Sequence, residues 1–394
     1  EMKLRDYQQR AINDLYDWFS KNHTGHPVVC LPGGSGKSVV IASVVTQAMK
    51  QWPETRILMM VGVKELIAQN YAKLRELWPN APVGIYSASL GKKCLSEPAT
   101  SGGSQSRANK AQQIGRIALC IIDECHSVSN TENGNYRKLL GELLAINPNM
   151  RVVGYTASPY RLGQGMITDG DDALFSEIIE PVTIQELVND GYLCKLQSKH
   201  TALTLDTSGV GKRGGDFVAS ALEAAVDTDE NNVLAVQEML IRGADRKSWL
   251  VFCSGIKHSH HVAQLLRDSG IDAECLTGET PSAERDSIVR RFKSNQLRCM
   301  VGVGVFSTGF DHPGVDLIAM LRPTESPGFY LQCAVRGSRP AYAPGMPLDT
   351  PEQRSEAMGA GPKPHGCMVL DFAGNIAKHG PITAIQPANK AGKG

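Results

Sequence analysis

Two adjacent carboxylates, Asp123 and Glu124, follow directly on the apolar run at 119–122. A carboxylate at the end of a buried strand costs free energy to desolvate unless a cation, a hydrogen-bonding partner or a reacting water compensates. An acidic residue there can hold a magnesium ion, and a neighbouring carboxylate can accept a proton from an attacking water. A strand-terminal acidic turn without chemistry is the alternative explanation of the pair.

A glycine-rich turn at 31–38, Leu-Pro-Gly-Gly-Ser-Gly-Lys-Ser, follows a short apolar run at 28–31. Glycines let the backbone point successive N–H groups at an anion, and the following helix adds its positive N-terminal end. Lys37 would reach the β- and γ-phosphates of a nucleotide, and Ser38 would ligate magnesium. A flexible glycine turn is the alternative, but together with the acidic pair the turn predicts one site for ATP and Mg²⁺.

Five further side chains have weaker local signals. His126 follows the acidic pair and is either a packed histidine or a relay to neighbouring elements. Thr156 and Ser158 follow a predicted strand, where their hydroxyls could hydrogen-bond the acidic pair or only cap a turn. Arg336 and Arg339 share one face of a helix or turn, which is usually a solvated face. They become relevant to catalysis only if their domain docks against the phosphate loop, where an arginine stabilises transition-state charge.

Short apolar runs alternate with helix-like segments along most of the chain. This alternation predicts βαβ units and an α/β fold with two tandem domains, each a mostly parallel sheet flanked by helices. The stretch at 90–110 is rich in Gly, Ser and Lys and predicts a loop, and the stretch at 339–366 predicts a surface excursion. The predicted strands are 28–31, 56–62, 119–122 and 151–155 in the first half, and 249–253, 273–276, 297–303, 317–321 and 367–372 in the second.

Composition limits the class of protein further. The chain has 394 residues, 42% hydrophobic and 21% charged, as in ordinary soluble proteins of two or three domains. Its net charge of +1 provides no overall basic field, so any nucleic-acid contact must use a local groove. No stretch approaches about 18 consecutive apolar residues, so no membrane partner is expected. The ten cysteines include no Cys-x-x-Cys pair, which favours a reduced cytoplasmic protein without a zinc site.

In their order and spacing, the motifs of this chain resemble those of the superfamily 2 helicases, with the acidic pair and His126 as a DECH box. The segments at 322–326 and 370–375 look like those of RadD-type DNA-repair helicases and their phage-encoded relatives. The family's last motif usually has Gly before its first arginine, where this chain has Val335. The matching segments are 4–8, 34–38, 63–66, 123–126, 156–158 and 307–311, followed by Gln332, Arg336 and Arg339.

The resemblance implies two RecA-like domains with ATP between them and a nucleic-acid strand across both. The implied boundaries are an ATP-binding domain at 1–195, a linker at 196–229, a helicase C-terminal domain at 230–380 and a tail at 381–394.

The resemblance also implies a role for each residue that matches a motif. Gln8 recognises adenine with Arg5 near it, Glu124 is the general base, and Asp123 and Ser38 hold Mg²⁺. The residues implied to bind phosphate are Gly34, Ser35, Gly36, Lys37 and Ser38. Those implied to couple hydrolysis to domain motion are His126, Thr156 and Ser158. Those implied to face the nucleotide from the second domain are Gly309, Asp311, Gln332, Arg336 and Arg339.

The function expected from these motifs is an ATP-dependent helicase or translocase that moves on a nucleic-acid strand. The resemblance favours single-stranded or forked DNA, with RNA as a further possibility, and repair or phage replication proteins as partners. Three alternatives remain open: a translocase or remodeler that does not separate strands, a nucleic-acid-binding module with a degenerate ATPase site, and the motor half of a restriction or defence complex.

Overall fold

The computed structural model describes residues 3–21, 24–62, 64–87, 92–94, 96–103, 111–128, 135–161, 165–304, 306 and 310–385. The chain forms two compact units, each described here by itself. The first comprises Glu1–Pro159 and Met166–Thr183, and the second comprises Tyr160–Gly165 and Ile184–Gly394. The predicted α/β class is confirmed in both units. Within the described residues, none of the helices has the length and apolar character that crossing a membrane requires.

The first unit contains an eight-stranded sheet in the order β10-β1-β7-β6-β2-β5-β3-β4. Every neighbouring pair is parallel except β3 and β4, which are antiparallel. The strands are β1 (Pro27–Cys30), β2 (Ile57–Val61), β3 (Val83–Ser87), β4 (Lys92–Lys93), β5 (Ala99–Gly103), β6 (Leu119–Asp123), β7 (Arg151–Thr156) and β10 (Glu177–Ile179). The short strands β8 (Tyr160–Arg161) and β9 (Gly165–Met166) follow β7 along the chain.

Strand register brings the predicted chemistry to one edge of this sheet. In β1, Cys30 lies opposite Thr156 of β7, and Asp123 of β6 lies opposite Tyr155. The carboxyl ends of these three parallel strands therefore coincide. The phosphate loop, the acidic pair and the Thr156 segment begin at that common edge.

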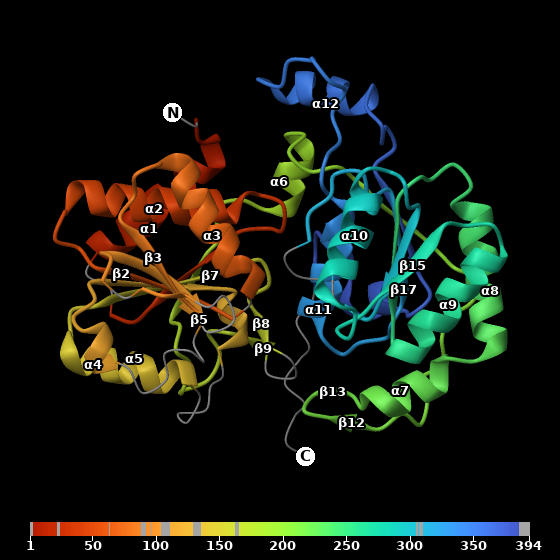
Figure 1. The fold of residues 1–394 in the computed structure, drawn as a ribbon, viewed down its shortest axis with the longest axis horizontal. Coiled ribbons are helices and arrows are strands. Elements are labelled where there is room, and N and C mark those ends of the chain that lie inside the picture. Colours follow the sequence, from red (N-terminus) through yellow and green to blue (C-terminus); the bar gives the residue numbers. More distant parts are fainter. Residues whose placement is uncertain are drawn as a thin grey trace. The chain divides into compact units, whose positions relative to one another are not determined.

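Helices cover both faces of the first sheet, as Figure 1 shows, with α1, α2 and α3 on one face and α4 and α5 on the other. Leu139, Leu140 and Leu143 of α5 follow helical spacing and pack with strand residues in one apolar cluster. The bounds are α1 (Asp6–Ser20), α2 (Lys37–Gln51), α3 (Lys64–Leu77), α4 (Ala111–Ile114) and α5 (Asn135–Ile146).

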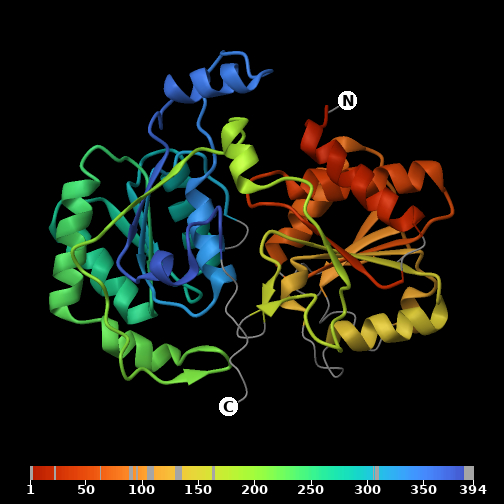
Figure 2. The same cartoon turned by 180° about the vertical axis from the view of Figure 1, so that it is seen from behind.

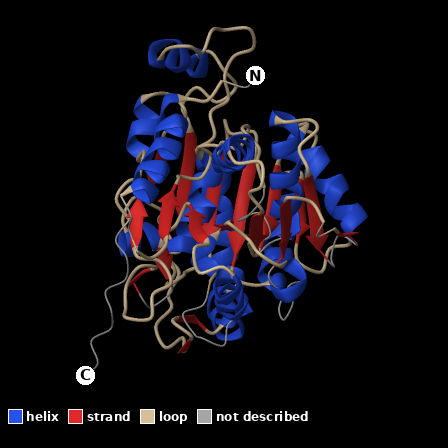
Figure 3. Ribbon diagram, turned by 90° about the vertical axis from the view of Figure 1, so that its left-hand side faces the viewer, coloured by secondary structure: helices blue, strands red, loops and turns tan. Residues whose placement is uncertain are grey.

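The second unit contains a six-stranded, fully parallel sheet in the order β11-β18-β17-β14-β16-β15. Along β14, Trp249 and Val251 belong to one apolar cluster, whereas Leu250 and Phe252 belong to another. This alternation buries both faces of the sheet. Figure 3 shows the helices (blue) that accompany the strands (red) in the protein. The strands are β11 (Leu196–Lys199), β14 (Trp249–Cys253), β15 (Ala273–Leu276), β16 (Cys299–Gly302), β17 (Leu317–Leu321) and β18 (Cys367–Asp371).

The helices of the second unit complete these two clusters. Val226 and Met239 join the cluster that contains Trp249, and Phe292 and Cys333 join the cluster that contains Phe252. The bounds are α6 (Ile184–Asn189), α7 (Ala219–Val226), α8 (Asp229–Arg242), α9 (Ile256–Asp268), α10 (Ser282–Lys293), α11 (Pro327–Ala334), α12 (Pro351–Gly359) and α13 (Asn375–His379).

Residues 196–229, expected to be a linker, instead belong to the second unit. β11 is an edge strand that pairs with β18, and Leu222 and Val226 are core residues. Figure 2 shows this yellow-green to green segment lying across the second unit. The composition was misleading because an exposed edge strand and a short hairpin, β12 (Lys212–Arg213) with β13 (Asp216–Phe217), carry mostly polar residues and glycine.

Two other expectations about organisation change. β5 lies within the stretch expected to be a loop, and it is a buried strand made of small residues. In the expected tail, Ile382 and Ile385 pack against a core cluster. Residues 386–394 of that tail lie outside the described residues.

Candidate active site

The phosphate loop is held against the first turn of α1. Gly34 and Gly36 both have φ near +84°, a conformation that favours glycine. A Cβ at Gly36 would lie 2.6 Å from Nε2 of Gln8, so the close approach also requires glycine. Gln8 Nε2 and the Tyr7 hydroxyl donate hydrogen bonds to the Ser35 carbonyl, at 2.9 and 2.6 Å. The start of α1 therefore fixes the shape of the loop.

Arg5 and Gln8 lie beside this loop. The Arg5 N–H donates to Gln8 Oε1 at 3.1 Å, and Arg5 Nη1 donates to the Tyr7 hydroxyl at 3.0 Å. The structure thus brings together the two residues expected near adenine, and their contact with a base stays a prediction.

Lys37 joins the loop to the acidic pair. Its ammonium lies 2.8 Å from Asp123 Oδ1 and also forms an ion pair with Glu124. Burial alone would lower the pKa of Lys37, but the charges of Asp123 and Glu124 outweigh burial and hold that pKa well above its ordinary value. Glu124 has φ of 52°, a strained conformation for a residue with a side chain, and such strain is often found at functional sites.

Asn70 completes the surroundings of Asp123 and was missed by the sequence analysis. Its Nδ2 donates to Asp123 Oδ2 at 3.0 Å from the buried face of α3. The available signal was a polar residue at a core position, because Leu66, Ile67 and Leu74 of α3 are buried at helical spacing around it.

The three residues expected to couple hydrolysis to motion form a connected chain. His126 Nδ1 lies 2.8 Å from Thr156 Oγ1 and 3.3 Å from Glu124 Oε2. The Ser158 N–H donates to Thr156 Oγ1 at 3.0 Å. Burial lowers the pKa of His126, and the charge of Lys37 adds to that effect against the opposing charge of Glu124. His126 is therefore neutral at neutral pH and links Glu124 to Thr156.

The donor set of this edge fits a nucleotide and a magnesium ion. The Ser35 hydroxyl is buried and has no hydrogen-bond partner among the described residues. Lys37 begins α2, whose first N–H groups lack partners within the helix and suit an anion. Ser38 and Asp123 supply the oxygen ligands that Mg²⁺ prefers.

The second unit brings three of its expected residues, Asp311, Arg336 and Arg339, close together. Arg336 Nη1 donates to the Phe310 carbonyl, and Arg339 Nη2 donates to Asp311 Oδ2 at 3.0 Å. Arg339 Nε lies 3.0 Å from the other oxygen of the same carboxylate. Gln332 is half-buried on α11 in the turn before Arg336, and Gly309 lies outside the described residues.

Each of the two units is of the α/β class, and in the first unit Lys37 of the glycine-rich loop lies beside two carboxylates at one edge of the sheet. Residues 1–161 match the family described as "Type III restriction enzyme, res subunit", and residues 231–341 match "Helicase conserved C-terminal domain". Both matches support the resemblance of the chain to the superfamily 2 helicases. The finer resemblance to RadD-type helicases stays a prediction.

Two relatives are similar over most of the chain. One is "Putative ATP-dependent helicase IRC3" of Saccharomyces cerevisiae, 27% identical over 85% of this chain and 49% of the relative. The other is the "51.5 kDa protein" of a Lactococcus phage (isolate 7-9), 27% identical over 78% of this chain and 61% of the relative. The chain thus spans about half to three-fifths of the length of these relatives.

Solved structures show the same fold. "The fragment structure of a putative HsdR subunit of a type I restriction enzyme from Vibrio vulnificus YJ016" matches with a TM-score of 0.67 and 18% identity, covering 98% of this chain and 68% of that one. "ATP-dependent Type ISP restriction-modification enzyme LlaBIII bound to DNA" matches with a TM-score of 0.65 and 15% identity, covering 94% of this chain and 27% of that one.

Proposed function

We propose that this chain is a nucleic-acid-dependent ATPase that couples ATP hydrolysis to movement along a strand, with DNA as the favoured substrate. The observation that carries the proposal is Lys37 of the phosphate loop in contact with both Asp123 and Glu124. Phosphoryl transfer to water requires a cation that reaches the phosphates, and it requires carboxylates for the metal ion and the attacking water. Both are present at one edge of this sheet.

In this proposal the first unit binds ATP and Mg²⁺ and activates the attacking water. The loop N–H groups and Lys37 hold the β- and γ-phosphates, and Ser38 and Asp123 hold Mg²⁺. A magnesium ion bound there neutralises charge that develops on the phosphate oxygens. Glu124 accepts the proton of the attacking water. Asn70 keeps Asp123 oriented through its hydrogen bond to Oδ2.

The remaining expected residues have supporting roles. We assign adenine recognition to Gln8, with Arg5 beside it. We assign the coupling of hydrolysis at Glu124 to motion of the chain to His126, Thr156 and Ser158. The hydrogen bonds that connect these three residues support this role.

The second unit supplies groups that act on the terminal phosphate. We assign that role to Gln332, Arg336 and Arg339, and we propose that Gly309 and Asp311 face the nucleotide. Arginine is suited to it because its planar guanidinium stabilises transition-state charge on phosphate oxygens.

Substrate and partners follow from the relatives. The restriction enzyme LlaBIII is described as bound to DNA, which favours DNA over RNA here. The preference for single-stranded or forked DNA is our proposal from the resemblance of the motifs. Repair or phage replication proteins remain our proposed partners. We also propose that the protein is reduced and cytoplasmic, and its ten free cysteines agree with that location. The second candidate function is the motor of a restriction enzyme, and the res-subunit family match and both solved structures favour it.

Two substitutions test the assignment of the site. Lys37→Ala should abolish ATP binding and turnover, because it removes the cation that reaches the phosphates. Glu124→Gln should keep ATP binding but lower turnover by roughly 10²- to 10⁴-fold, as expected for loss of a general base. Binding is measured with a fluorescent ATP analogue and turnover by phosphate release.

Matched controls come from exposed residues of the same unit. Lys21→Ala removes a lysine that pairs with Asp17 on the surface, and Glu76→Gln alters a carboxylate that pairs with Lys73. Both controls should hydrolyse ATP like the parent protein. Undiminished turnover in Lys37→Ala and Glu124→Gln would exclude the proposed active site.

A further inference from the structure

Lys363 is a buried lysine whose ammonium is surrounded by main-chain oxygens. Its side chain is 4% exposed, and Nζ donates to the carbonyls of Val315, Gly337 and Arg339 at 2.9, 3.0 and 2.6 Å. A buried ammonium is unfavourable unless its hydrogen bonds are satisfied, and a lysine has three N–H donors. Three carbonyls satisfy all three, so the ammonium fixes the relative positions of the main-chain segments that provide them.

Two of these three carbonyls belong to the segment 335–339, here called the arginine turn, which contains Arg336 and Arg339. The Cys194 N–H donates to the Ser338 carbonyl at 2.7 Å, so three consecutive carbonyls of the turn, at 337, 338 and 339, accept hydrogen bonds. Gly337 is packed closely, because a Cβ there would lie 2.4 Å from Cys367 Sγ. The main chain of the arginine turn is therefore held at successive residues.

The guanidinium groups of the turn contact a different segment. Arg336 donates to the Phe310 carbonyl, and Arg339 pairs with Asp311. The chain continues from there to Val315, whose carbonyl is the third acceptor of Lys363. Lys363 thus joins the main chain of the arginine turn to the segment that its arginines contact.

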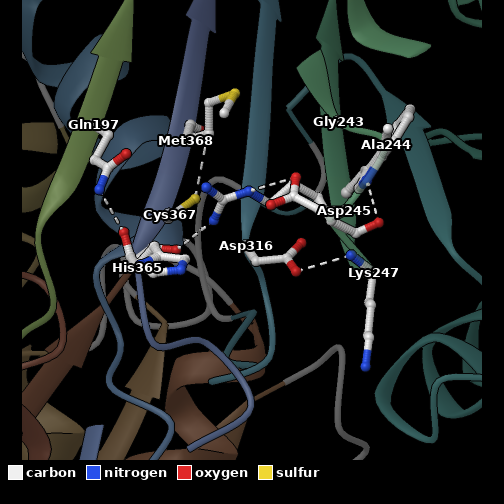
Figure 4. A network of polar contacts seen from close by, with 12 residues as sticks. Gln197, Gly243, Ala244, Asp245, Lys247, Asp316, His365, Cys367 and Met368 are labelled. Carbon is white, nitrogen blue, oxygen red and sulfur yellow. Dashed lines mark hydrogen bonds and ion pairs between the residues drawn. The ribbon is translucent and has the colours of Figure 1, made fainter. Parts of the chain in front are cut away.

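The chain that follows Lys363 is held at residues 365–367 by a network of hydrogen bonds, part of which is shown in Figure 4. Gln197 Nε2 donates to the His365 carbonyl at 2.8 Å, and the Cys367 N–H donates to the Lys195 carbonyl at 3.0 Å. Arg246 Nη1 donates to the Gly366 carbonyl at 3.0 Å.

The same network fixes the chain next to Val315. The Asp316 carboxylate accepts from the main-chain N–H groups of Lys247 and Ser248, at 2.8 and 2.9 Å. The segment that carries Lys363 and the residue after Val315 are therefore both anchored to the sheet.

We propose that Lys363 is a positioning residue for Arg336 and Arg339 in ATP hydrolysis. This inference rests on the proposed function. Lys363 fixes the main chain of the arginine turn. The guanidinium groups are therefore already in position when charge develops on the terminal phosphate, and they need not rearrange. A misplacement of about 1 Å at such a group lowers rate by roughly 10²-fold.

The test compares Lys363→Met in two backgrounds. In the parent protein, the substitution should lower kcat for ATP hydrolysis by roughly 10- to 100-fold, the range expected for a misplaced catalytic group, while KM for ATP changes by less than about twofold. In the Arg336→Ala/Arg339→Ala background, Lys363→Met should cause no further decrease of kcat, because the groups it positions are already absent.

Controls separate positioning from folding. Lys247→Met is the matched control, because that side chain is exposed and only its main-chain N–H joins the network. It should leave kcat unchanged. If Lys363→Met lowers the melting temperature too far for assay, Lys363→Gln retains two N–H donors and takes its place in both backgrounds.

An unchanged kcat in the folded Lys363 variant, or an equal decrease in the arginine-free background, would overturn the proposal. The two failures are distinguishable. A parent protein that does not hydrolyse ATP contradicts the proposed function, whereas a hydrolysing parent with an unaffected Lys363 variant contradicts only this inference.

Discussion

The ammonium groups of Lys37, which is partly buried, and of Lys363, which is buried, are stabilised in different ways. Lys37 contacts two carboxylates, and such a contact can be replaced during a reaction: the lysine can pair with another anion, and the carboxylates can pair with another cation. Lys363 contacts three neutral carbonyls, which belong to the main chain and stay with it. The first arrangement suits binding and turnover of a charged ligand, and the second suits a fixed structural position.

The phosphate loop provides a prediction at the scale of a single residue. Gly36→Ala should abolish ATP binding, because the residue has φ of 84° and an added Cβ would lie 2.6 Å from Gln8 Nε2. Isothermal titration with ATP measures the effect.

Gly141→Ala is the matched glycine variant. Gly141 lies in α5 with open space where a Cβ would be, so alanine there should leave ATP binding unchanged and stabilise the fold by about 0.5 to 1 kcal/mol. Normal ATP affinity in Gly36→Ala would contradict the loop geometry described here.

Some residues of the site were visible in the sequence and others were not. Lys37 could be predicted because it lies in a glycine-rich turn. Asp123 and Glu124 could be predicted because they follow directly on an apolar run. The contacts of Asn70 and Lys363 could not be predicted, because their partners are 53 residues away in one case and as many as 48 in the other. No local pattern specifies a contact of that kind.

At the scale of elements, each predicted strand lies within two residues of an observed one, but the buried strand β3 and the strand β10 were not predicted. β14, β15 and β17 match the predicted ranges, since each is a short run of apolar residues. β5 was missed because it contains Ala, Thr, Ser and Gly, and β11 was missed because an edge strand can remain polar. An apolar run in the sequence thus identifies a strand that is buried on both faces of its sheet, but it does not identify strands in general.

α9 provides a pH-dependent prediction. His258 is fully buried, its Nδ1 accepts from the Ser254 N–H, and burial lowers its pKa to about 4 against the opposing charges of Asp227 and Glu223. In the unfolded chain a histidine has a pKa near 6.5. Below that pH the unfolded chain takes up a proton that the folded protein does not, so the free energy of unfolding falls as pH falls.

The expected loss from this histidine between pH 7 and pH 5 is about 2 kcal/mol. His258→Asn keeps an acceptor near the position of Nδ1 but does not titrate, so its stability should depend less on pH in this range. Urea unfolding of both proteins at several pH values measures the difference. Equal pH dependence in the two proteins would show that His258 titrates normally in the fold.

At the scale of the whole molecule, each unit has its own mostly or fully parallel sheet and its own buried core. With a net charge of +1, the chain has no general affinity for polyanions, so binding of nucleic acid requires a local arrangement of cationic groups. Such binding should be sensitive to salt and weakly dependent on sequence, because it is directed at phosphates.

The most direct test of the central claim is the rate of ATP hydrolysis by the intact chain with and without nucleic acid. Single-stranded DNA, forked DNA, duplex DNA and RNA of equal length are compared at one salt concentration. We expect hydrolysis to be slow without nucleic acid and to rise with single-stranded or forked DNA more than with RNA. An equal rate in the absence and in the presence of every nucleic acid would contradict a nucleic-acid-dependent motor.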